Sequence, residues 1–149
     1  MLHIPFETIP VDDSFNINAA DYKRPNGGVV IANPNAPTSI GRGLDFMREI
    51  LDANPDSVVI SDEAYVDFGG TSSVPLLKEY ENLVVVQTFS KSRSMAGMRI
   101  GYALGNKEII SALFAAKDSY NSYPLDSVAI AAGVASVEDE EYFLSLIHI

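Results

Sequence analysis

Four short runs of apolar residues divide the chain, and each predicts a β-strand. The runs are continuous rather than alternating, which is typical of strands that are buried on both faces of a sheet. They cover residues 28–32, 57–60, 83–86 and 99–104. A further strand candidate, 6–11, precedes them.

Helical periodicity separates these runs. Leu44, Met47, Ile50 and Leu51 recur at a spacing of 3.6 residues, and Asn54 with Pro55 ends the pattern. Asn106 is placed to cap a second helix. Residues 124–135 predict a third helix, and Ser136 with Asp139 resembles a capping box that would begin a fourth.

Alternating strands and helices predict an α/β fold with three layers, α/β/α, around a mostly parallel sheet. The run 99–104 follows 83–86 too closely for a crossover helix, so we expect it to pair antiparallel or to lie elsewhere in the sheet.

The length of 149 residues allows at most one domain. Residues 1–143 are expected to form part of a large domain. Residues 144–149, Leu-Ser-Leu-Ile-His-Ile, resemble the translation of a sequencing adapter. We therefore expect that the helix beginning near 138 is not completed by this tail, and that the chain is a fragment.

Composition narrows the classes of function. The net charge of −10 disfavours nucleic acids and anionic membranes as partners. Without cysteine, and with His3 and His148 at opposite ends, no metal site is expected. No apolar stretch reaches membrane-spanning length, and the first residues lack the features of a secretory signal, so we expect a cytoplasmic protein.

Polar side chains that could bind a ligand or take part in a reaction follow three of the predicted strands. In open α/β sheets, ligands bind at the carboxyl ends of the strands. The residues placed there, in chain order, are Asn35, Asp62, Tyr65, Thr88, Ser90, Lys91 and Arg99.

A pyridoxal phosphate site needs this set of groups. A lysine amine holds the aldehyde, a carboxylate keeps the pyridine nitrogen protonated, and hydroxyls with a guanidinium fix the phosphate. Each residue alone has an ordinary alternative: a solvated lysine, a turn aspartate or a half-buried tyrosine. Their joint placement favours the cofactor site.

In these motifs the chain resembles the fold-type I pyridoxal phosphate aminotransferases, and most closely the histidinol-phosphate aminotransferase group. The matching segments are Ser90-Lys91 with Arg99, Asp62-Glu63-Ala64-Tyr65, and the asparagine-proline turn 33–38. The resemblance spans about residues 6–143, the central part of the large domain.

The resemblance implies a role for each residue. Lys91 would be the catalytic Schiff-base lysine, and Asp62 would pair with the pyridine nitrogen. Tyr65 would bond the ring oxygen, while Ser90, Arg99 and, more weakly, Thr88 would hold the phosphate.

The asparagine-proline turn departs from the family pattern at two positions. Ala36 replaces the asparagine that usually touches the ring oxygen, which leaves Asn35 as a substitute. Ser39 replaces glycine, and this would strain the turn if the position requires a positive φ. The family's glycine-containing phosphate loop, its ring-stacking aromatic and its C-terminal small domain have no counterpart here.

The resemblance implies an enzyme that transfers an amino group between L-histidinol phosphate and 2-oxoglutarate in histidine biosynthesis. Its partners would be small amino and keto acids, and the parent would be a homodimer. The alternatives are a related class I/II aminotransferase, a threonine-phosphate decarboxylase, or a truncated chain that is inactive in isolation. Tyr120 and Tyr123 are expected to pack against the rest of the protein.

Overall fold

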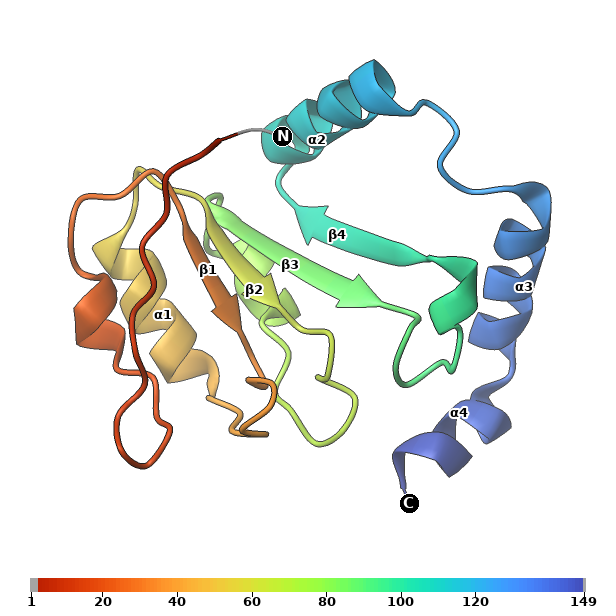
Figure 1. Cartoon of the computed structure of the whole chain (residues 1–149), viewed down its shortest axis with the longest axis horizontal. Coiled ribbons are helices and arrows are strands. Elements are labelled where there is room, and N and C mark those ends of the chain that lie inside the picture. Colours follow the sequence, from red (N-terminus) through yellow and green to blue (C-terminus); the bar gives the residue numbers. More distant parts are fainter. Residues whose placement is uncertain (1–2, 149) are drawn as a thin grey trace.

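A mixed four-stranded sheet forms the centre of the computed structural model, which describes residues 3–148 (Figure 1). The strands lie in the spatial order β1-β2-β3-β4, the same as their order along the chain. Their bounds are β1 Val29–Ala32, β2 Val59–Asp62, β3 Leu83–Thr88 and β4 Gly101–Gly105. The predicted α/β architecture with a mostly parallel sheet is confirmed.

Strands β1, β2 and β3 are parallel, and their register aligns their carboxyl ends. Ala32 pairs with Asp62, and Asp62 in turn pairs with Val86. The segments that leave these strands therefore emerge at one edge of the sheet.

Strand β4 is antiparallel to β3, which is the first of the two placements expected from its short connection. The connection contains only the 3-10 helix η3, Ala96–Met98, because too few residues are available for a crossover helix. Thr88 pairs with Gly101, so β4 begins beside the end of β3.

Helix α1, Leu44–Ala53, covers one face of the sheet and builds the core (Figure 1). Its apolar stripe matches the predicted 3.6-residue spacing, and Asn54 ends it with a backbone bond to Leu51. The 3-10 helices η1, Ala19–Tyr22, and η2, Val74–Lys78, add further side chains. The buried cluster comprises Ala19, Val29, Ile31, Phe46, Met47, Ile50, Leu51, Val59, Leu76, Leu83 and Val85.

Three helices follow β4 and form an arc beside the sheet (Figure 1). They are α2 Lys107–Tyr120, α3 Ser127–Glu138 and α4 Glu140–Ile147. Asn106 caps α2 as predicted, with its Oδ1 accepting from the Ile109 amide at 2.9 Å. Asp126 caps α3 in the same way, through the Ala129 amide at 2.7 Å.

Two expectations about the last helix are wrong. Asp139, not Ser136, caps α4, because its own carboxylate accepts from the Tyr142 amide at 3.0 Å. The helix also continues past Phe143 to Ile147, since the residues of the tail carry apolar side chains compatible with helix. The adapter-like origin of residues 144–149 stays a prediction.

The strand candidate at residues 6–11 is also wrong. This segment is irregular and lies outside the sheet, which in the described residues begins with β1. Phe6 is 85% exposed, so the apolar pattern there finds no ladder to join.

Several apolar side chains stay exposed around the sheet and the arc. Val30, on the face of β1 opposite α1, is 67% exposed. Tyr120 and Tyr123 are 95% and 91% exposed, which contradicts the expectation that they pack. Among residues 3–148, no helix is both long and apolar enough to cross a membrane.

Candidate active site

Asp62 is the last residue of β2, and the pleat turns its side chain to the face opposite Ser61. The carboxylate is half-buried, and its Oδ1 accepts a hydrogen bond from the Ala64 amide at 3.1 Å. This bond holds Asp62 in the turn that leads directly to Tyr65.

Lys91 and Tyr65 lie together, although they come from different strand ends. The Lys91 Nζ atom is 5.0 Å from the centre of the Tyr65 ring. A cation at this distance from an aromatic ring is attracted by the electron density of the ring face. The structure thus brings the predicted amine next to the predicted phenol, on the edge where Asp62 ends its strand.

The two loops that carry these side chains are tied to each other. Ser92 is 2% exposed, and its hydroxyl donates to the Asp67 carboxylate. Ser92 follows Lys91 directly, and Asp67 lies two residues beyond Tyr65. The hydrogen bond of Ser92 therefore restricts the backbone position of the neighbouring Lys91, from which the lysine side chain extends.

Ser90 and Thr88 form a pair of hydroxyls at the end of β3. The Thr88 Oγ1 lies 3.0 Å from the Ser90 hydroxyl and accepts from the Ser90 amide at 3.1 Å. It also lies 3.3 Å from the Ile100 carbonyl, which fastens the turn to the start of β4. Both hydroxyls are half-buried beside the lysine loop.

Arg99 is exposed, and its backbone has a φ of 55° in the left-handed region. Its guanidinium donates to the Ala96 carbonyl at 2.7 Å, within its own turn. In the described residues the Arg99 side chain makes no hydrogen bond to Ser90 or Lys91, and its phosphate role stays a prediction.

Asn35 belongs to the turn after β1 and bonds inside it. Its side-chain amide donates to the Thr38 hydroxyl at 2.8 Å, so the structure leaves its contact with a ring oxygen as a prediction. Ser39 in the same turn has a φ of 62°, which is the strained conformation anticipated for a residue in place of glycine.

Sequence reasoning missed Glu63, which lies beside Asp62 and is 1% exposed. A signal was present: an acidic residue directly at the end of an apolar strand is placed to be buried, and a buried carboxylate requires donors. Tyr102, on β4, was also missed. Burial raises the pKa of the Tyr102 phenol, and the Asp67 carboxylate adds to that rise.

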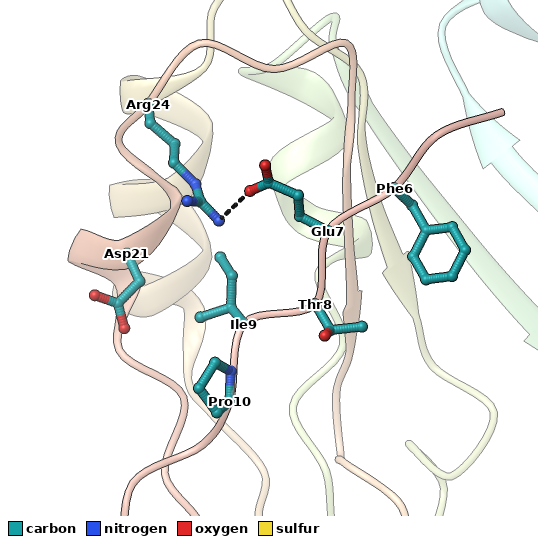
Figure 2. A pocket seen from close by; sticks show the side chains of 7 residues that line it. All are labelled: Phe6, Glu7, Thr8, Ile9, Pro10, Asp21 and Arg24. Carbon is teal, nitrogen blue, oxygen red and sulfur yellow. Dashed lines mark ion pairs between the residues drawn. The ribbon is translucent and has the colours of Figure 1, made fainter.

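Two surface hollows lie along the N-terminal segment. One is lined by residues that include Phe6, Ile9 and Asp21, and across it Glu7 and Arg24 point toward each other with 3.1 Å between Oε2 and Nη2 (Figure 2). The other lies near Asp12 and Arg42. Neither hollow contains a predicted site residue, so they do not mark the site.

Comparisons with known proteins bear on this arrangement. Residues 2–146 match the family described as aminotransferase class I and II. The histidinol-phosphate aminotransferase 2 of Dechloromonas aromatica is 55% identical over 97% of this chain and 41% of its own length. The histidinol-phosphate aminotransferase of Acinetobacter baumannii strain AB307-0294 is 59% identical over 91% of this chain and 37% of its own length.

A solved structure has the same fold. It is the histidinol-phosphate aminotransferase from Sinorhizobium meliloti in complex with pyridoxal-5'-phosphate, with a TM-score of 0.75 and 22% identity. The alignment covers 95% of this chain and 40% of that one. The chain thus spans about two fifths of the length of its relatives. Because the family match extends over nearly the whole sequence, this chain belongs to the aminotransferase class I and II family.

Proposed function

We propose that Lys91, Asp62 and Tyr65 bind pyridoxal 5'-phosphate at the carboxyl edge of the sheet. The observation that carries this proposal is the Lys91 amine 5.0 Å from the Tyr65 ring, on the edge where the Asp62 carboxylate ends β2. An amine, a phenol and a carboxylate are the groups that this cofactor requires, so the residues fit it.

Each side chain would do a distinct task. The Asp62 carboxylate, which accepts from the Ala64 amide, would accept a hydrogen bond from the protonated pyridine nitrogen. Tyr65 would donate a hydrogen bond to a ring oxygen, and Asn35 would be a second donor to it from the β1 turn. Ser90 and Thr88 would donate hydrogen bonds to phosphate oxygens, and Arg99 would add positive charge if its guanidinium leaves the Ala96 carbonyl. The bound cofactor would supply an electron sink, and Lys91 would carry the proton that moves during transfer.

The parent protein is proposed to transfer an amino group between L-histidinol phosphate and 2-oxoglutarate. Relatives 55% and 59% identical bear the name histidinol-phosphate aminotransferase, which favours this substrate over threonine phosphate. We further propose a cytoplasmic homodimer as the working form. Since this chain spans 37–41% of those relatives, we propose that in isolation it binds cofactor without completing transamination.

Cofactor binding is tested by titrating the chain with pyridoxal 5'-phosphate and recording the visible absorbance of a lysine-bound cofactor. Lys91→Ala should abolish a saturable band, whereas Lys107→Ala, a matched change at an exposed lysine of α2, should keep it. Equal titrations for both variants would refute Lys91 as the attachment point. Asp62→Asn should retain the absorbance band of the lysine-bound cofactor but lower the affinity for the cofactor, because the amide does not stabilise a proton on the pyridine nitrogen.

A further inference from the structure

Glu63 is a buried carboxylate that is satisfied by neutral donors. Its Oε1 accepts from the Ser73 amide at 2.6 Å and lies 3.3 Å from the Ser61 hydroxyl. Its Oε2 accepts from the Ser72 hydroxyl at 2.7 Å and from the Gln87 side-chain amide at 2.9 Å. Taking a carboxylate out of water is costly unless hydrogen bonds replace the lost hydration, and these contacts supply that replacement.

The partners of Glu63 come from two strands and one loop. Ser61 is in β2, Gln87 is in β3, and Ser72 with Ser73 closes the loop that begins at Glu63 itself. Gln87 extends the network, because its Oε1 accepts from the Tyr102 hydroxyl on β4. One side chain thus fastens both ends of the segment 63–73 to the sheet.

That segment contains Tyr65 and directly follows Asp62, two of the residues proposed to face the cofactor. Asp62 precedes Glu63 and points to the other face of the strand, as neighbouring strand residues do. The Asp62 carboxylate is held by the Ala64 amide, and Tyr65 follows one residue later. The orientation of Asp62 and Tyr65 therefore depends on the backbone that Glu63 anchors.

We infer that Glu63 is a positioning residue that sets Asp62 and Tyr65 at the cofactor edge through its bond to Gln87. The effect of Glu63 on cofactor binding rests on the proposed function. The anchoring itself depends only on contacts within this chain.

Swapping the two side chains isolates the bond between them. Glu63→Gln replaces one acceptor oxygen by an NH2 group. This group then faces a donating amide, of Gln87 or of Ser73, unless the Gln87 amide rotates and reverses its bond with Tyr102. Adding Gln87→Glu restores a donor-acceptor pair across the strands, and the new carboxylate can still accept from Tyr102. The double variant keeps composition and charge while reversing the direction of the hydrogen bond.

The direct readout is the exchange rate of the Ala64 amide proton, measured by NMR in deuterated buffer without cofactor. Glu63→Gln should speed this exchange by about tenfold or more relative to the α1 amides, because the Asp62 carboxylate loses its fixed geometry. The double variant should return the rate to near that of the unsubstituted chain. Glu81→Gln, the same change at an exposed site, should leave it unaltered.

Unchanged exchange at Ala64 in Glu63→Gln, or a double variant no better than the single one, would overturn the inference. If Glu63→Gln unfolds the chain, Gln87→Ala removes one donor and should give the same local acceleration; slow exchange there would also overturn it. Pyridoxal 5'-phosphate titrations of the same variants should show weakened binding in the single and recovery in the double. Failure of the unsubstituted chain to bind cofactor would refute the proposed function, while the exchange comparison still decides the role of Glu63.

Discussion

Replacing Ser39 by glycine should stabilise the chain, although the change removes a side chain and adds none. Ser39 has a φ of 62°, where the Cβ atom of an L-residue crowds the neighbouring backbone and costs roughly 1–2 kcal/mol. Glycine avoids this cost and gives up roughly 0.5–1 kcal/mol through the greater freedom of the unfolded chain. The difference is about 0–1.5 kcal/mol, with a mid-range value of about 0.75 kcal/mol in favour of Ser39→Gly.

Ser39→Ala is the matched control, since alanine keeps the Cβ atom and loses only an exposed hydroxyl. The backbone bond from the Ser39 amide to the Asn35 carbonyl, 2.8 Å, should remain in both variants. Thermal unfolding should raise the midpoint of Ser39→Gly by about 1–4 °C, with Ser39→Ala close to the unsubstituted chain. A midpoint for Ser39→Gly at or below that of Ser39→Ala would refute the argument from backbone strain.

Three further substitutions probe the core, a tight backbone approach and a surface ion pair. Ile50→Ala removes a fully buried side chain of α1 and should cost about 2–5 kcal/mol in urea unfolding. Gly70→Ala would put a Cβ atom 2.8 Å from the Pro34 Cγ atom, so we expect a loss of about 1–3 kcal/mol by the same assay. Glu79 bonds Arg48, which lowers the pKa of its carboxyl below the ordinary 4.5. The stabilisation from this pair is present above that value and is lost as pH falls through the lowered pKa, so the midpoint difference between Glu79→Gln and the unsubstituted chain should shrink in acid.

The sheet could be predicted because its strands are buried, and burial leaves continuous apolar runs that need no knowledge of partners. The connection to β4 is too short for a crossover, which excluded a parallel neighbour of β3 but left its place in the sheet open. The strand predicted at residues 6–11 was wrong, because an apolar pattern forms a strand only where another strand is available to pair with it. The packing predicted for Tyr120 and Tyr123 was wrong, because the exposure of a tyrosine depends on whether other segments of the fold contact it and not on its own chemistry.

The sequence predicts site residues at the strand ends, and the structure brings two of them, Lys91 and Tyr65, together. Their roles stay predictions. The role of Glu63 could not be predicted, because its four donors come from residues 61, 72, 73 and 87, whose convergence depends on the register of β2 and β3. The left-handed backbone of Arg99 is likewise invisible in sequence, since arginine seldom adopts it.

The proposed site is tested most directly by identifying the lysine to which the cofactor attaches. The chain is incubated with pyridoxal 5'-phosphate, reduced with borohydride to fix any lysine adduct, digested, and mapped by mass spectrometry. We expect the pyridoxyl group on Lys91 at substoichiometric cofactor, with the other lysines essentially unmodified. Label spread evenly over exposed lysines, or an unmodified Lys91, would contradict the site.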